Sequence, residues 1–248
     1  MVSDKFHDSA GVPWQGREFQ SNSWASDDGS APDELASALS QVPLNKAHLV
    51  EVVSRTRLLI PLLATGGEAE MGPHGLLVEK SADLGIVAVA TPDGKTAIPA
   101  FSCTKELTLW SSSARPVPTS AAKIALAAAS EGHERVVIDP AGARVALRRT
   151  WLPAIAQGLA WLPPHLNPRV LELILAAAKG QQVIAGVELL DGDPKGTLEG
   201  AELLIQVALQ PGLDSGQLQN MLAEFSAELQ SQEFLALVDS ISLRLIPA

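Results

Sequence analysis

The chain has one cysteine, Cys103, no tyrosine, and only five tryptophans and five phenylalanines among its 248 residues. Because a single thiol cannot close a disulfide within the chain, we expect no intrachain disulfide, and a cysteine-based zinc site would need at least three ligands of other types. A reducing cytoplasm is the predicted location. With so few aromatic residues, the core is expected to consist mainly of Leu, Val, Ile and Ala side chains.

Basic residues are also scarce, and long apolar runs are absent. The chain carries 18 Lys and Arg against 28 Asp and Glu, a formal net charge of −10. A surface of this charge repels phosphate on average, and the basic residues never cluster beyond pairs such as Arg148-Arg149. No segment has the pattern of a signal peptide or a membrane helix. We therefore expect no nucleic-acid partner, no membrane partner and no export.

The order of patterned segments predicts an α+β fold of two small lobes, each a mostly antiparallel sheet covered by helices. Residues 1–32 are polar but contain Trp14 and Trp24, which indicates an arm docked on the rest of the protein. Residues 33–157 are expected to form one α+β domain and residues 165–248 a second. The proline-rich stretch between them is typical of a domain junction.

Apolar periodicity and turn residues predict the individual elements. Helices are expected at 33–39, 44–53, 104–110, 119–130, 168–179 and 215–230, and strands at 58–64, 84–90, 96–101, 135–138, 144–148, 182–190, 201–208 and 241–246. Pro61 indicates an edge strand or a bulge. Residues 84–90 are apolar at both parities, which predicts a strand covered on both faces. Residues 66–75 are expected to be a loop, and the last three strands to form one antiparallel sheet.

Several motifs occur in a specific order along residues 11–150. They are GVPWQGR at 11–17, DDG at 27–29, LLIPLL at 58–63, EK at 79–80, TPDG at 91–94, IPAFS at 98–102, RPVP at 115–118 and DPAG at 139–142. Together they resemble the SseB family, in particular its actinobacterial members. The resemblance implies an α+β fold and a cytoplasmic setting but no particular reaction. Cys103 departs from the Thr or Ser that usually follows this Phe-Ser motif, so a role for its thiol would be particular to this chain.

Cys103 is the main candidate for catalysis. It precedes the predicted helix 104–110, whose dipole and unpaired amides would lower a thiol pKa. No histidine lies near it in sequence, and no arginine follows within six residues. A buried Cys103 acting as a small hydrophobic side chain is favoured. A thiol or sulfur-transfer enzyme that uses Cys103 is the alternative function.

The segment 191–202 resembles much of a calcium-binding loop, with acidic residues in the first, third, ninth and twelfth positions and glycine in the sixth. The candidate ligands are Asp191, Asp193, Glu199 and Glu202. The fifth position, which needs an oxygen ligand, holds Lys195, and the flanking segments are predicted strands, where an EF-hand requires helices. A polar hairpin connection is favoured, with a calcium-responsive lobe as a further alternative.

The leading hypothesis is a non-enzymatic cytoplasmic binding or regulatory module. No catalytic, cofactor or metal site is expected, since no phosphate loop, dinucleotide fingerprint or nucleophile elbow is present. The partner is expected to be a protein or a small metabolite, and a homodimer is possible. The candidate partner-binding residues are Trp14, Arg17, Trp24, Lys80 and Arg115, because indoles and guanidinium groups often anchor interfaces. The competing interpretation is that the arm wraps its own globule, with Arg17 paired to Asp27, Asp28 or Glu79.

Overall fold

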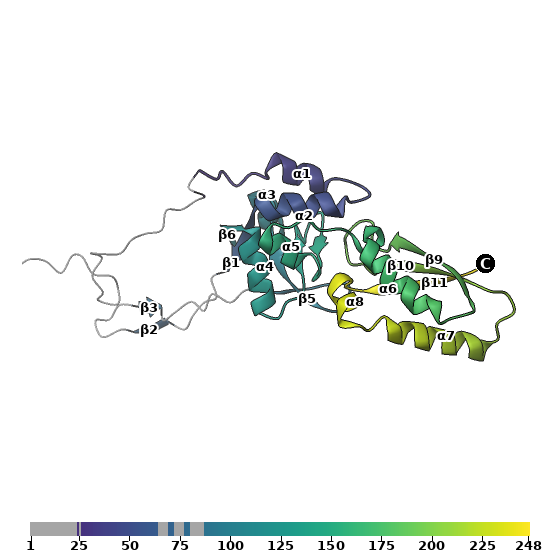
Figure 1. The fold of residues 1–248 in the computed structure, drawn as a ribbon. Coiled ribbons are helices and arrows are strands. Elements are labelled where there is room, and N and C mark those ends of the chain that lie inside the picture. The colour runs from purple at the N-terminus through teal and green to yellow at the C-terminus, as the bar shows by residue number, and fades with distance from the viewer. Residues whose placement is uncertain (1–23, 25, 64–68, 72–76, 80–86) are drawn as a thin grey trace, which may run out of the picture.

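The computed structural model describes residues 24, 26–63, 69–71, 77–79 and 87–248. These residues form two groups of helices and strands, each around its own main hydrophobic cluster. Figure 1 shows the first group in purple to teal beside the second in green to yellow. We call residues 26–63 and 87–157 the N-terminal lobe and residues 164–248 the C-terminal lobe. The predicted α+β class is confirmed.

The N-terminal lobe is a small mixed sheet between helices. Its helices are α1 (Asp33–Leu39), α2 (Lys46–Arg55), α3 (Thr104–Trp110), α4 (Ala121–Ser130) and α5 (Leu152–Gln157), and its strands are β1 (Arg57–Leu62), β4 (Val89–Ala90), β5 (Thr96–Ala100), β6 (Arg115–Ser120), β7 (Val136–Ile138) and β8 (Val145–Leu147). Strands β4, β5, β7 and β8 form one sheet in that order, and β1 and β6 form an antiparallel ribbon. A bridge between Leu59 and Phe101 joins the ribbon to the end of β5.

Successive residues of these strands point to opposite faces, and both faces are covered. Leu58 packs into the main cluster with α2, α4 and α5, whereas Leu59 packs with Leu107 of α3 on the other face. In β7, Val136 and Ile138 face the main cluster and Val137 faces a small third cluster. This explains why the strand segments are apolar at both parities.

The C-terminal lobe places its helices on one face of a three-stranded sheet. Its elements are the 3₁₀ turn η1 (Pro164–Leu166), α6 (Pro168–Lys179), β9 (Ile184–Asp191), β10 (Leu203–Leu209), α7 (Ser215–Glu228), α8 (Gln232–Leu237) and β11 (Ile241–Pro247). In central β10, Leu203, Ile205 and Val207 are buried in the second cluster with residues of α6 and α7. Asp214 and Gln217 form a capping box that starts α7.

The prediction of one antiparallel sheet in this lobe is wrong for its last strand. Strands β9 and β10 are antiparallel, but β11 runs parallel to β10. The chain passes through α7 and α8 before entering β11, and such a crossover returns it to the end of the sheet where β10 began. The periodicity of residues 241–246 predicts a strand but carries no information on its direction.

Other differences concern short elements. The helices α5 and α8 and the strand β6 were not predicted, and β2 (Ala69–Met71), which pairs antiparallel with β3 (Leu77–Glu79), falls inside the predicted loop. Within the predicted strand 84–90, residues 84–86 lie outside the described residues, and Ala90 is exposed, so coverage of both faces is wrong there. Pro61 lies in β1, but the outer strand of the ribbon is β6, because β1 also forms a bridge to Phe101 through Leu59. None of the helices in the described ranges is both long and apolar enough to cross a membrane.

Candidate functional site at the junction of the lobes

Buried charges join the two lobes. Arg135 precedes β7, Arg148 follows β8, and both guanidinium groups donate to Asp239, which follows α8. The Nη2 of Arg135 lies 2.8 Å from Oδ2 of Asp239, and the Nη1 of Arg148 lies 3.1 Å from the same oxygen. The side chain of Asp239 is 0% exposed. Breaking a buried pair leaves an uncompensated charge, so these contacts hold the lobes in one arrangement.

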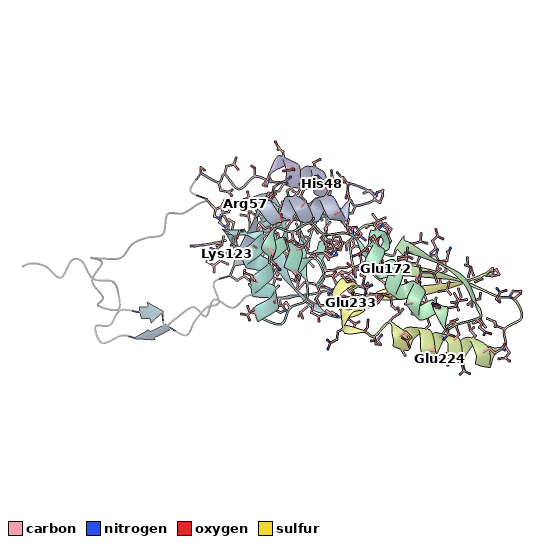
Figure 2. The ribbon with its side chains drawn as sticks, in the orientation of Figure 1. His48, Arg57, Lys123, Glu172, Glu224 and Glu233 are labelled. Carbon is pink, nitrogen blue, oxygen red and sulfur yellow. The ribbon has the colours of Figure 1, made fainter. Side chains whose placement is uncertain are left out.

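Exposed ion pairs on the C-terminal lobe support the position of α8. Figure 2 shows Glu172 on α6 and Glu233 on α8, and Arg169 of α6 donates to both carboxylates, at 2.8 and 2.6 Å. These carboxylates raise the pKa of Arg169. Exposed pairs of this kind contribute little to stability, because solvent screens them. Their effect is to hold the helix that leads into Asp239.

The loop between β9 and β10 folds around the carboxylate of Asp193. This carboxylate accepts from the backbone N–H groups of Thr197 and Leu198, at 3.1 and 2.9 Å, and from Nη2 of Arg148 at 2.6 Å. The loop also continues the N-terminal sheet, because the N–H of Ala146 in β8 donates to the carbonyl of Gly196 at 2.8 Å. Asp193 therefore shapes the loop and fastens it to the other lobe.

Glu202 completes the junction. Its Oε1 accepts from Nε1 of Trp151 at 2.7 Å and from Oγ1 of Thr150 at 3.0 Å, and its Oε2 accepts from the N–H of Asp239 at 2.7 Å. Burial, with a smaller effect from the charge of Asp239, raises the pKa of Glu202, although the hydrogen bonds from the N–H of Asp239 and from Trp151 and the charge of Arg148 act in the opposite direction. The carboxylate therefore connects Thr150 and Trp151 of the N-terminal lobe to the segment after α8.

Three of the four predicted calcium ligands thus contact groups of this chain. Asp191 pairs with Lys46 of α2, Asp193 with Arg148, and Glu202 with Trp151 and Thr150, whereas Glu199 is exposed. In the parts of the chain that the structure describes, no group of three or more His, Cys, Asp or Glu side chains is arranged to hold a metal ion. The acidic pattern is accounted for by contacts between the lobes.

Millimolar calcium is therefore expected to leave the melting temperature of the full chain unchanged. A ligand that prefers the folded state must raise the melting temperature, and here calcium would have to displace Lys46 and Arg148. Differential scanning fluorimetry with calcium measures this, and magnesium at the same ionic strength controls for charge screening. A rise seen with calcium alone, and lost in Asp191→Asn, would show that the loop binds calcium after all.

A cavity of about 190 Å³ lies where this loop meets the N-terminal sheet. Its walls come from the β4–β5 hairpin, the end of α3, strands β7 and β8, and the loop. The apolar lining includes Val89, Pro92, Trp110, Val137, Ala146 and Leu198. Both lobes contribute to it, so the charge pairs of the junction also fix the shape of this cavity.

The hydroxyl of Thr91 in the cavity lining is hydrogen-bonded, but three other polar side chains of the lining have no partner among the described residues. Arg144 and Glu199 are exposed, and neither side chain makes a hydrogen bond or an ion pair in these ranges. The Oγ1 of Thr197 is buried without a hydrogen-bond partner. Buried polar groups are nearly always paired, so the unpaired Oγ1 of Thr197 is an exception, whereas the exposed Arg144 and Glu199 are open to a group that enters from outside the chain.

Unusual backbone conformations surround the same cavity. Arg144 and Leu198 line it with φ of +54° and +64°, and Asp139, with φ of +52°, precedes the lining residue Pro140. They are the non-glycine residues with positive φ in the described ranges. This conformation is uncommon for residues with a side chain and recurs at functional sites. For Leu198, the buried contact with Ala97, Val137 and Ala146 offsets the strain.

Cys103 is not among the residues that line the cavity. It is the N-cap residue of the seven-residue helix α3, is half-buried, and makes no capping hydrogen bond through its side chain. The neighbouring Ser102 donates from its N–H and its Oγ to Asp139, at 2.8 and 2.7 Å, and burial raises the pKa of this carboxyl. Thiol chemistry at Cys103 stays a hypothesis.

Among the predicted partner-binding residues, the two that the structure describes do not lie together. Trp14, Arg17 and Lys80 lie outside the described residues. Trp24 is half-buried near Asp27, and Arg115 is exposed at the start of β6. Asp27 binds Arg57, whose partner in the β1–β6 register is Ser120. Ser120 and Arg115 are at opposite ends of β6, so about 17 Å of strand separates the Asp27–Arg57 pair from Arg115.

The competing interpretation paired Arg17, which lies outside the described residues, with Asp27, Asp28 or Glu79. Asp27 accepts from Nε and Nη2 of Arg57, and this guanidinium holds the pKa of the carboxyl below its usual value. Asp28 accepts from the N–H and the hydroxyl of Ser30. These two carboxylates therefore have partners within the N-terminal lobe.

Several motifs on which the family resemblance rests contact one another in the fold. Asp93 of the TPDG motif binds Arg135 at 2.7 Å, and Ser102 of the IPAFS motif binds Asp139 of the DPAG motif. Residues 33–154 match the family model of the SseB protein N-terminal domain. These residues are an SseB domain.

The family prediction is thereby confirmed, and the actinobacterial type stays a prediction. The SseB domain contains Arg135, Arg148 and Arg144, whereas Asp193, Glu199 and Asp239 follow it in sequence. Both the charge cluster and the cavity are thus built from the SseB domain together with the segment that follows it. The comparisons with curated proteins and with solved structures found no match.

Proposed function

We propose that this chain is a non-enzymatic cytoplasmic binding module that takes a small ligand in the cavity between the SseB domain and the 191–202 loop. The observation that carries the proposal is the contrast between neighbouring charges. Arg148 and Asp193 bind each other at 2.6 Å, whereas Arg144 and Glu199, a few residues away, line the cavity with no partner in the described ranges. Charges that pair within a protein stabilise its fold, and unpaired polar groups converging on an apolar cavity are typical of ligand sites.

The surrounding structure supports ligand binding with little rearrangement. The cavity walls are held by the Arg148–Asp193 pair, by the hydrogen bond from Ala146 to Gly196, and by buried Leu198. A preformed site loses less conformational entropy on binding than a site that must first be ordered. This favours a binding role over one that depends on large motions of the lobes.

A ligand screen on the full chain tests the proposal. Ligand-observed NMR with a fragment library would be run on wild type, on Ala90→Trp and on Ala236→Trp. Ala90 is an exposed residue of the cavity lining, so an indole there is expected to obstruct the cavity, whereas Ala236 is exposed on α8 and is not part of the lining. We expect fragments that bind wild type and Ala236→Trp but not Ala90→Trp. If no fragment loses binding in Ala90→Trp, the cavity is not a ligand site.

A protein partner, including a second copy of the chain, is the second candidate. The segment from α5 to α6 leaves leucines exposed by 40 to 63%, namely Leu159, Leu162, Leu166, Leu171 and Leu175. Exposed apolar residues that gather in one region favour contact with another protein. This surface includes none of the sequence-predicted partner residues.

A further inference from the structure

The cavity carries one positive and one negative group, and both are held in place by the backbone. The N–H of Arg144 donates to the carbonyl of Asp139 at 2.9 Å, and β8 starts at the next residue. Glu199 lies between buried Leu198 and Gly200, whose carbonyl accepts from Nη2 of Arg148 at 2.7 Å. The backbone of each charged residue is therefore held in place, that of Arg144 in the N-terminal lobe and that of Glu199 in the C-terminal lobe.

No ion pair joins Arg144 to Glu199, although opposite charges at one cavity attract. The apolar side chains that line the cavity, among them Trp110 and Val137, make its interior less polar than bulk water, which strengthens charge-assisted hydrogen bonds formed inside it. A planar guanidinium is suited to a carboxylate, and a carboxylate is suited to an ammonium group. A ligand with both charges would pair with Arg144 and Glu199 at once.

Resting on the proposed function, we infer that the cavity binds a small zwitterion with an apolar body, of the class of the apolar α-amino acids. The ligand carboxylate binds Arg144. The ligand ammonium binds Glu199. The apolar side chain packs against Trp110, Val137 and Pro92. A simple carboxylate, a simple amine and a neutral apolar molecule each leave at least one of these groups unsatisfied.

The test uses three probes with the same apolar body: phenylalanine, 3-phenylpropionate, which lacks the ammonium, and phenethylamine, which lacks the carboxylate. Affinities for the full chain would be measured by isothermal titration calorimetry. We expect phenylalanine to bind at least about tenfold more tightly than either partial probe, because each lost probe charge removes one charge-assisted hydrogen bond. Equal or weaker binding of phenylalanine would overturn the inference.

Two variants assign the charges. Arg144→Gln is expected to weaken phenylalanine and 3-phenylpropionate about tenfold and to leave phenethylamine unchanged, and Glu199→Gln should do the reverse for the partial probes. Arg115→Gln and Glu228→Gln, at exposed positions elsewhere, are the matched controls. Loss of affinity in neither cavity variant would overturn the assignment.

The blocked variant Ala90→Trp separates the two proposals. One outcome is that Ala90→Trp abolishes the binding of other molecules while phenylalanine binds no more tightly than 3-phenylpropionate or phenethylamine. In that case the zwitterion inference fails and the binding function stands. If binding is insensitive to Ala90→Trp for every probe and fragment, both fail.

Discussion

Replacing Asp239 with alanine is expected to destabilise the folded chain by about 3 to 5 kcal/mol, the usual cost of removing one partner of a buried charge cluster. Asp239 receives hydrogen bonds from Arg135 and Arg148, and all three side chains are at most 2% exposed. Without the carboxylate, two buried guanidinium groups lose a shared counter-charge. Equilibrium unfolding in urea at neutral pH measures the change in the free energy of unfolding.

The matched control for this prediction is Glu228→Ala. Glu228 is an exposed acid in the last turn of α7, and its loss is expected to change stability by about 0.5 kcal/mol or less. Asp239→Asn keeps the volume and one acceptor, so its effect should fall between the two. Similar unfolding midpoints for Asp239→Ala and Glu228→Ala would show that the cluster does not hold the lobes.

Trp151→Ala is expected to cost about 3 to 5 kcal/mol through lost packing alone. Trp151 is 0% exposed, packs in the main N-terminal cluster and lies 4.9 Å from Trp161 between ring centroids. Its Nε1 also donates to the buried carboxylate of Glu202 at 2.7 Å. The substitution therefore creates a cavity and removes a donor from a buried carboxylate.

Trp151→Phe separates these two effects. Phenylalanine keeps much of the packing but donates no hydrogen bond, and a bond to a charged group contributes about 1.5 to 3 kcal/mol. Trp161→Phe, at the partly buried partner ring, is the control and is expected to cost about 1 kcal/mol. If Trp151→Phe were no more destabilising than Trp161→Phe, the bond to Glu202 would contribute nothing measurable.

The elements that could be predicted are those with a clear periodicity or a clear start. Helices α1, α3 and α6 have the predicted bounds, because Pro32 and Pro168 favour helix starts and Thr104 to Trp110 follows a complete strand. The strand β6 could not be predicted, since Pro116 and Pro118 normally argue against a strand. Helices α5 and α8 have six residues each, which is too short for a periodic signal.

The candidate site could be predicted only in part, because its contacts connect distant residues. Asp239 lies 104 and 91 residues from its two arginine partners, and nothing around it in sequence distinguishes it from a surface acid. The two arginine partners of Asp239, in contrast, do carry a signal in the sequence. Arg135 and Arg148 flank fully apolar strands, and a buried arginine requires a partner.

The acidic pattern of 191–202 shows the same limit. Its carboxylates have the spacing of metal ligands, but spacing does not reveal which cation they meet. In the fold they meet Lys46 and Arg148, from a different lobe. The cavity depends likewise on the approach of Arg144 to Glu199, which follows from how the 191–202 loop packs on β8.

Pro116 and Pro118 limit how a further strand could pair with the outer side of β6. Leu59 exchanges both backbone hydrogen bonds with Phe101, so it faces away from β6, and its register partner Pro118 correspondingly faces away from β1. Pro116 has the same parity. No strand of the described ranges pairs with that border, which offers carbonyl groups but lacks amide donors at both positions. An incoming strand would find these donors missing, so this border is poorly suited to templating another chain.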